Sequence, residues 1–450
     1  MTRNAGAFAR IVKNAGWLLG GQSLAAVLSI AYLAMVTRTL GLNGFGVFSL
    51  ILGIAQTTAT IATFQSWQIL IHYGVDHVRD GRRDRLDRLI WFCVGLDAAS
   101  ALIGSALSIV AVGLLAKGYG WNGTTSATAI AFCMASMLSF RSTPIGLLRL
   151  NDRYAAAATA DAAAPIVKMM GAGVVVWQGW GLIGFLSVWA LADVAVSAAY
   201  WIMAATTCDA PWTRSRPRIG GVRTDNEGLL RYAMTTNATS SLKIGSRSLA
   251  ILVIGMIAGT VAAGAYRLCL QLSTAISKAS QMISRSMFPE IARSRAEGCG
   301  ELSTMLGRVI RMSLAIAFVA MLILPTAGPY ALQAIGGHEY RTWTGLLAII
   351  GGAAVVDMAA TAFEPALFAL GRQTVAFRIS CITTVVMITA MIPATHLWGA
   401  HGAGVTVLLA SIATAVAMGM QVRLALSEND AARLRACNDD EPPEGLAAAA

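Results

Sequence analysis

The stretch GLNGFGVF, residues 41–48, returns later in the chain as GTVAAGAY, residues 259–266. Both copies keep glycine at the first and sixth positions and an aromatic residue at the eighth, and the second copy lies 218 residues after the first. A second pair, WGLIG at 180–184 and WGAHG at 398–402, has the same offset. Two different motifs repeated at one offset indicate that the chain contains one structural unit twice.

The composition is that of a membrane protein. Of the 450 residues, 56% are hydrophobic and only 13% are charged, whereas soluble domains carry roughly 25% charged residues. Apolar runs follow one another from Trp17 to Val422, and each is long enough to cross a hydrocarbon core about 30 Å thick. Lipid offers no hydrogen-bond partner to an open backbone, so these runs must be helices. We predict an all-α polytopic membrane protein.

Twelve transmembrane helices are predicted, six on each side of a polar segment at 208–228. The spans are residues 15–39, 44–71, 89–116, 123–147, 155–177, 181–205, 229–258, 261–289, 304–326, 343–368, 375–395 and 402–424. Because each half holds an even number of spans, the halves are parallel six-helix bundles related by a pseudo-twofold axis along the membrane normal. The predicted domains are an N-terminal bundle at 1–207, a cytoplasmic linker at 208–228, a C-terminal bundle at 229–426 and a disordered cytoplasmic tail at 427–450.

The basic residues predict the orientation. Of the 34 Lys and Arg residues, 26 fall on the N-terminus, on the loops that follow even-numbered spans and on the tail. Only Arg38, Lys117 and Arg341 fall on the opposite side, so both termini are predicted to be cytoplasmic. Topology then accounts for the net charge of +11, and some of the basic loops are expected to contact anionic membrane lipids. No nucleic-acid partner is expected.

Residues with catalytic or metal-binding spacing do not stand out. His72 and His77, like His396 and His401, are five positions apart, which does not stack them on one helix face, and the seven Cys include no Cys-x2-Cys pair. The chain has no Walker-type loop with which to couple itself to ATP. We therefore expect a transporter rather than an enzyme, with no cofactor and no metal.

Charged residues inside the spans are the functional candidates, because each costs roughly 2.5–3.5 kcal/mol at a helix centre. Along the eighth span, polar residues at intervals of three and four share one helix face: Arg267, Gln271, Thr274, Lys278, Gln281 and Arg285. A second polar face lies on the seventh span: Asn237, Ser240, Lys243 and Arg247. Neither helix face can point into lipid, so both are predicted to face protein or water.

Two interpretations of these faces are open. A hydrated cavity lined by cations would receive an anion such as phosphate or pyrophosphate, because Arg suits bidentate oxygen recognition and Lys acts as a point charge. The candidate substrate-binding residues are Asn237, Lys243, Arg247, Arg267, Gln271 and Lys278. Alternatively, the cations neutralise membrane acids such as Asp97 across the bundle. The candidate ion-coupling residues are Asp161, Lys168, Asp193 and Asp357. Asp161 and Lys168 share a helix face, so they could form an internal ion pair or belong to a coupling-ion site.

Seven stretches, in order along the chain, resemble a known family: VTRTLGLNGFGVFSL (36–50), GLLRLNDRY (146–154), GMIAGTVAAGAYRL (255–268), MFPEIARS (287–294), GGHEYRTW (336–343), ALGRQTVAF (369–377) and WGAHGAGVTVLL (398–409). They are similar to the polysaccharide-biosynthesis flippases of the multidrug/oligosaccharidyl-lipid/polysaccharide exporter superfamily. The resemblance implies two six-helix bundles around a V-shaped cavity in the cytoplasmic (inner) membrane of a bacterium.

The resemblance also implies a function. Such a flippase moves a polyprenyl-pyrophosphate-linked oligosaccharide from the inner to the outer leaflet by alternating access, for exopolysaccharide, capsule or O-antigen. The implied partners are this lipid-linked substrate, membrane lipids, and the polymerase and glycosyltransferases of the same pathway. Family members often carry an acid before the apolar run of the seventh span, where this chain has Arg247. That cation suits an anionic headgroup and removes the acid on which one coupling mechanism relies.

Two other functional classes stay open. A cation-coupled multidrug or metabolite antiporter of the same superfamily would bind its ligand through membrane acids, for which Asp161 and Asp193 are the candidates. A non-transporting scaffold for glycosyltransferases would leave the charged faces of the seventh and eighth spans without a purpose.

Overall fold

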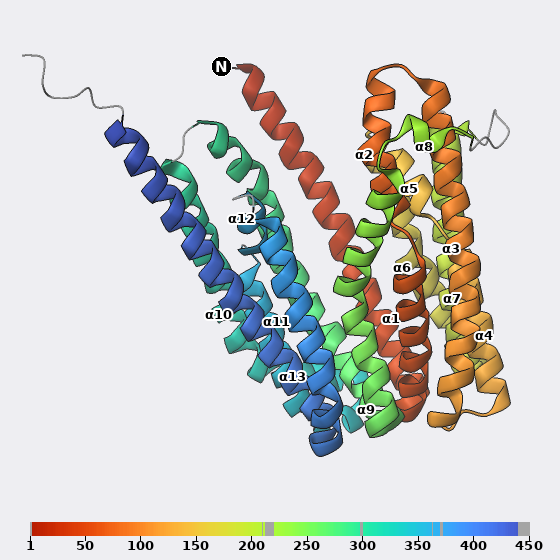
Figure 1. The fold of residues 1–450 in the computed structure, drawn as a ribbon. Helices are drawn as coiled ribbons and strands as arrows, with labels where there is room; N and C mark the ends of the chain where they lie inside the picture. Colours follow the sequence, from red (N-terminus) through yellow and green to blue (C-terminus); the bar gives the residue numbers. More distant parts are fainter. Residues whose placement is uncertain are drawn as a thin grey trace, which may run out of the picture. The chain divides into compact units, whose positions relative to one another are not determined.

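The computed structural model is helical in every regular element of the residues that it describes (Figure 1). The backbone is described at residues 2–208, 210–211, 220–297, 300–361, 363–369 and 372–439, and side chains, with short gaps, at 27–237, 248–274 and 311–425. The all-α class predicted from the apolar runs is confirmed.

The helices fall into a first and a second half of the chain. The first half contains α1 (Thr2–Ala62), α2 (Ser66–Arg79), α3 (Arg83–Gly118), α4 (Gly123–Leu138), α5 (Ser142–Leu150), α6 (Tyr154–Gln178), α7 (Gly181–Thr207) and α8 (Val222–Asp225). The second half contains α9 (Leu229–Glu297), α10 (Gly300–Gly336), the 3-10 helix His338–Trp343, α11 (Thr344–Ala360), α12 (Phe363–Ala369) and α13 (Gln373–Asp439). Within the described chain, nine segments are long and apolar enough to cross a membrane. The protein therefore belongs to the multi-pass membrane class. The twelve spans, the pseudo-twofold axis and the side of the termini stay predictions.

The two longest of the nine segments each run through a turn between two predicted spans. Val27–Arg79 and Thr374–Ala425 are 53 and 52 residues long, because the chain turns inside α1 and α13 with almost no loop. The turn in α1 lies at Gly41, with φ 66° and ψ −175°, and that in α13 lies at Gly399, with φ 58° and ψ −142°. A positive φ is strained for a residue with a β-carbon, so glycine is what permits these turns.

The same backbone geometry occurs at the equivalent positions of the repeat. Gly259 in α9 has φ 88° and ψ 173°, which matches Gly41 at the offset of 218 residues. Gly181, at the start of α7, has φ 55° and is the equivalent of Gly399. The repeated glycines of the sequence therefore mark repeated turns of the chain.

The two equivalent turns also contact each other. A β-carbon on Gly46 would overlap the backbone carbonyl of Thr260, and one on Gly264 would lie 2.9 Å from the Cα of Gly46. The Thr260 hydroxyl donates a hydrogen bond of 2.5 Å to the side-chain carbonyl of Asn43. Glycine recurs at the sixth position of the motif because the two backbones meet there with no room for side chains.

Internal contacts divide the chain into two compact units, each of which is described by itself. The first unit is Met1–Leu268 with Tyr330–Trp343, and the second is Cys269–Pro329 with Thr344–Ala450. In the first unit α6 packs along α7, and α1 lies against α3 and α6. In the second unit α11 packs along α13, and Gly351 leaves room for the side chain of Leu324.

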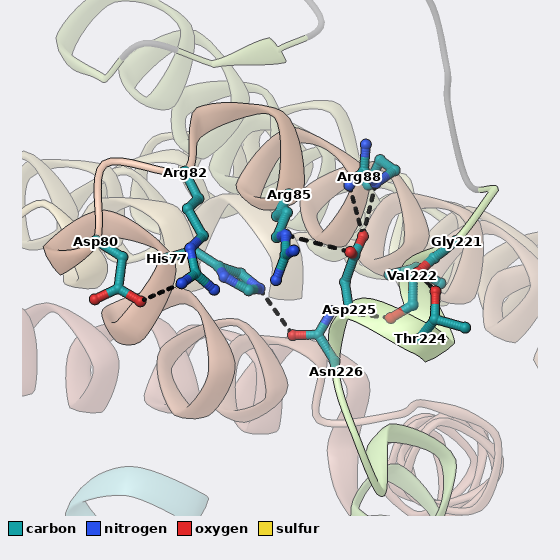
Figure 2. Close-up of polar contacts among 10 residues, drawn as sticks. All are labelled: His77, Asp80, Arg82, Arg85, Arg88, Gly221, Val222, Thr224, Asp225 and Asn226. Atoms are coloured by element: carbon teal, nitrogen blue, oxygen red, sulfur yellow. Dashed lines mark hydrogen bonds and ion pairs between the residues drawn. The ribbon is translucent and has the colours of Figure 1, made fainter.

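The polar segment predicted as a linker is anchored on the first unit (Figure 2). The carboxylate of Asp225 in α8 accepts hydrogen bonds from Nε and Nη2 of Arg88, at 2.8 and 2.7 Å, and lies 3.3 Å from Nε of Arg85. Beside it, the side-chain oxygen of the buried Asn226 lies 2.9 Å from Nε2 of His77. These contacts hold α8 against the adjoining ends of α2 and α3.

Candidate functional site

A lysine lies on an aromatic ring inside the first unit. Lys168 of α6 places its Nζ 3.4 Å from the ring centroid of Trp189 in α7. The two helices pack side by side, which brings these residues together. A cation over a tryptophan face gains about 2 kcal/mol when desolvated, and it keeps its charge. The ring of Trp189 therefore stabilises the ammonium group of Lys168 within the helices.

Two rings of α1 hold Trp189 in place. The ring of Tyr32 meets it edge-on at a centroid distance of 5.9 Å, and that of Phe48 does so at 5.7 Å. Tyr32 precedes the turn at Gly41 and Phe48 follows it, so both arms of α1 contribute. Edge-to-face packing of this kind favours one fixed ring orientation. We call Tyr32, Phe48 and Trp189 the aromatic platform.

Two arginines lie within electrostatic range of the lysine on this platform. Arg267 of α9 is half-buried and lies within electrostatic range of Lys168 and of Tyr32. Arg141, which precedes α5, also interacts with Lys168. Like charges repel strongly where water is scarce, so such a group is stable only with a carboxylate or a bound anion beside it.

One described carboxylate interacts electrostatically with Lys168, that of Asp193 in α7. Its Oδ1 lies 4.0 Å from Nη1 of Arg141, and its Oδ2 accepts a hydrogen bond of 2.9 Å from the hydroxyl of Ser136. We call Arg141, Lys168, Asp193 and Arg267 the cation cluster. Three cations and one carboxylate give it a surplus of two positive charges among the side chains that the structure describes.

The most deeply buried acid among the described side chains, Asp97 of α3, has a different environment. Its Oδ1 accepts a hydrogen bond of 2.6 Å from the Ser66 hydroxyl, and its Oδ2 accepts two from Thr143, at 2.8 Å from the backbone N–H and 2.7 Å from the hydroxyl. Ser66 begins α2 and Thr143 lies in the first turn of α5. A carboxylate at a helix N-terminus satisfies free N–H groups and complements the helix dipole.

These contacts correct two expectations. The predicted spans 44–71 and 123–147 are each interrupted, because α1 ends at Ala62 before α2 begins and α4 ends at Leu138 before α5 begins. Asp97 joins the two interruptions, and its hydrogen-bond partners in the described chain are hydroxyl and amide groups rather than membrane cations. Asp97 is therefore a structural link and lies outside the cation cluster.

Asp161 and Lys168 share helix α6 but have different partners. The Asp161 carboxylate accepts a hydrogen bond of 2.8 Å from the hydroxyl of Tyr200. Among the side chains described, no ion pair joins Asp161 to Lys168. Of the predicted ion-coupling set, the structure thus brings Lys168 and Asp193 together and places Asp161 with Tyr200. Asp357 is exposed on α11 in the second unit.

The predicted substrate-binding residues all lie on α9. Arg267 belongs to the cation cluster, Asn237 is half-buried in the first unit, and Gln271 is exposed in the second. The remaining three have helical backbones, and their side chains lie outside the described residues: Lys243, Arg247 and Lys278.

Sequence reasoning missed Arg141, Tyr32 and Trp189. Arg141 was counted with the cytoplasmic end of the fourth span, because the interruption between α4 and α5 carries no clear signal apart from Pro144 just after it. Tyr32 and Trp189 are apolar enough to pass as packing residues in long apolar runs. Their roles depend on which helices are neighbours, which no helical spacing reveals.

Comparison with known proteins agrees with this architecture. Residues 35–344, more than half of the chain, match the family described as "Polysaccharide biosynthesis protein". The chain is 22% identical over 290 residues to the Inner membrane protein YghQ of Escherichia coli (strain K12), an alignment that covers 64% of this chain and 82% of that protein.

Solved structures of low sequence identity share the fold. An inward-facing multidrug resistance MATE family transporter of the MOP superfamily matches with a TM-score of 0.66 and 15% identity, over 90% of this chain and 95% of that one. Lipid II flippase MurJ, in an inward closed conformation, matches with a TM-score of 0.67 and 12% identity, over 90% and 87%. The family match over residues 35–344, together with this fold, identifies the chain as a member of the polysaccharide biosynthesis protein family.

Proposed function

We propose that the protein is a flippase that moves a polyprenyl-pyrophosphate-linked oligosaccharide from the inner to the outer leaflet of the inner membrane, for surface polysaccharide biosynthesis. Family membership, the fold shared with Lipid II flippase MurJ and the relation to an inner membrane protein support this proposal. The observation that carries it is the surplus of positive charge in the cation cluster.

The charge of the cluster suits the headgroup of such a lipid. A pyrophosphate that joins a lipid to a sugar has two acidic oxygens, and both are ionised near neutral pH. A surplus of two positive charges balances these two negative charges. Arg141 and Arg267 offer forked N–H donors for phosphate oxygens, and Lys168 offers a point charge. The apolar tail would stay in lipid while the headgroup crosses beside the cluster, so only the headgroup needs a polar path.

Several features predicted from the sequence belong to this proposal. Rocking of two six-helix bundles would alternate access to the substrate. The other residues predicted from the polar faces of the seventh and eighth spans would add contacts to the substrate: Asn237, Lys243, Arg247, Gln271 and Lys278. Asp193 is the described acid best placed for coupling to an ion, because it already shares the cluster with Lys168.

The alternative is a cation-coupled multidrug or metabolite antiporter, and the likeness to MATE family transporters is the observation that favours it. A site for cationic cargo needs carboxylates without cationic partners. Asp193 lies against Arg141, and Asp97 is occupied by three hydrogen bonds. The surplus charge of the cluster has the wrong sign for such cargo.

Charge removal in the cluster tests the proposal. Lys168→Gln and Arg267→Gln should each lower surface polysaccharide at least tenfold and make the lipid-linked precursor accumulate in the membrane. Lys117→Gln is the matched control, because Lys117 is an exposed lysine at the end of α3. Each variant's abundance in the membrane is measured alongside. Wild-type amounts of polysaccharide in both cluster variants at normal abundance would refute the proposal.

A further inference from the structure

The Tyr32 hydroxyl is a buried polar group without a hydrogen-bond partner in the described chain. Tyr32 is 5% exposed, and its hydroxyl makes no hydrogen bond to any part of the chain that the structure describes. Buried hydroxyls normally find a partner, because an unmet hydrogen bond costs stability. Phenylalanine would supply the same ring to the aromatic platform without that cost. The hydroxyl therefore needs a partner outside the described part of the chain.

The surroundings of this hydroxyl indicate what would satisfy it. It lies within electrostatic range of the guanidinium of Arg267. The ring of Tyr32 packs against Trp189, and Nζ of Lys168 lies 3.4 Å from the ring centroid of the same tryptophan. Lysine and arginine side chains are donors without acceptor atoms. A ligand that enters among these groups must bring the acceptor, and the surplus positive charge selects one that is negative.

We propose that the Tyr32 hydroxyl donates a hydrogen bond to an unesterified oxygen of the substrate's pyrophosphate, and that Tyr32 is a specificity-determining residue for this group. The inference rests on the proposed function. It assigns separate contributions to the two kinds of side chain, since the cation cluster supplies charge while Tyr32 supplies one directed donor. Hydrogen bonds to charged acceptors are about twice as strong as neutral ones.

The structure also offers a matched control on the same helix. Ser49 lies in α1, is fully buried, and has a hydroxyl without a hydrogen-bond partner in the described chain. Tyr32→Phe and Ser49→Ala each remove one buried hydroxyl and leave every ring of the platform in place. A difference between these variants in ligand binding therefore reports on the position of the hydroxyl.

The experiment measures binding and thermal stability of the full chain in lipid nanodiscs. The probes are undecaprenyl pyrophosphate, undecaprenyl monophosphate and inorganic pyrophosphate, each titrated against wild type, Tyr32→Phe and Ser49→Ala. We expect Tyr32→Phe to weaken binding of undecaprenyl pyrophosphate by about tenfold to a hundredfold, with a melting temperature equal to or above that of wild type. Ser49→Ala should bind as wild type does. A weaker effect of Tyr32→Phe on the monophosphate would support recognition of the pyrophosphate, and an equal effect would overturn it.

Each of the other outcomes counts against either the role of Tyr32 or the flippase proposal. Binding by Tyr32→Phe within twofold of wild type would overturn the inference and leave the flippase proposal standing, provided that wild type binds. A lowered melting temperature of Tyr32→Phe would show that the hydroxyl stabilises the fold, which also overturns it. Inorganic pyrophosphate that binds as tightly as the lipid would make free pyrophosphate the ligand and would overturn the assignment to a lipid headgroup. Failure of wild type to bind any probe would refute the flippase proposal itself.

Discussion

Asp97→Ala should lower the free energy of unfolding by about 2–5 kcal/mol, because it removes the acceptor for three buried donors. The side chain is 1% exposed, so water cannot replace it. The hydroxyls of Ser66 and Thr143 can turn to backbone carbonyls of the segments that precede their helices, so the loss of these two hydrogen bonds is the smaller part of the cost. The Thr143 amide cannot turn, and a buried amide without a partner costs about 1–3 kcal/mol by itself.

Asparagine at the same position separates hydrogen bonding from charge. In Asp97→Asn the amide oxygen can accept both bonds from Thr143, and the amide nitrogen can donate to the Ser66 hydroxyl once that hydroxyl turns. We therefore expect a cost of about 1 kcal/mol and transport close to wild type. A role of Asp97 in ion coupling would give the opposite pattern, with normal stability and lost transport.

The assay is unfolding of the purified chain in detergent, followed by tryptophan fluorescence, for wild type, Asp97→Ala and Asp97→Asn. Surface polysaccharide is measured for the same variants. A loss below about 0.5 kcal/mol for Asp97→Ala, the size of an ordinary surface substitution, would refute the role of Asp97 as a structural link. So would an Asp97→Asn variant as unstable as Asp97→Ala.

Two further substitutions test the fold. Gly46→Ala should destabilise the protein by about 1–3 kcal/mol, because its β-carbon would overlap the facing backbone. Gly113→Ala is the control, since a β-carbon there meets nothing within 4 Å. Equal stability of the two variants would contradict the close contact at Gly46. Asp225→Asn should speed trypsin cleavage after Arg223, because the paired carboxylate that holds α8 is lost. Asp76→Asn, at an exposed pair that contributes little, should leave the cleavage rate unchanged, and an equal effect of both would count against the anchor.

The fold was predictable where the signal is local. Long apolar runs indicate membrane helices whatever their neighbours, and glycine at Gly41 and Gly259 indicates turns because few other residues adopt a positive φ. The repeat offset identified those turns as equivalent, and the backbone angles agree. The interruptions before α2 and α5 were not predictable, because they lie inside apolar runs and depend on Asp97, a partner from another helix.

The site was predictable only along single helices. Spacing placed Arg267 on a polar face of α9, and composition marked Lys168 and Asp193 as costly charges inside spans. The meeting of Lys168 and Asp193 depends on the packing of α6 against α7, which is a property of the tertiary fold. Trp189, the residue on which Lys168 lies, is indistinguishable in sequence from a tryptophan that faces lipid.

Transport by the purified chain in proteoliposomes tests the central claim most directly. A polyprenyl-pyrophosphate-linked oligosaccharide is placed in the liposomes, and its appearance in the opposite leaflet is followed with a lectin or a glycosidase that cannot cross the bilayer. The flippase proposal predicts translocation well above that of protein-free liposomes, and its loss in the Lys168→Gln, Arg267→Gln double variant. Translocation no faster than in protein-free liposomes, or equally fast in the double variant, would contradict it.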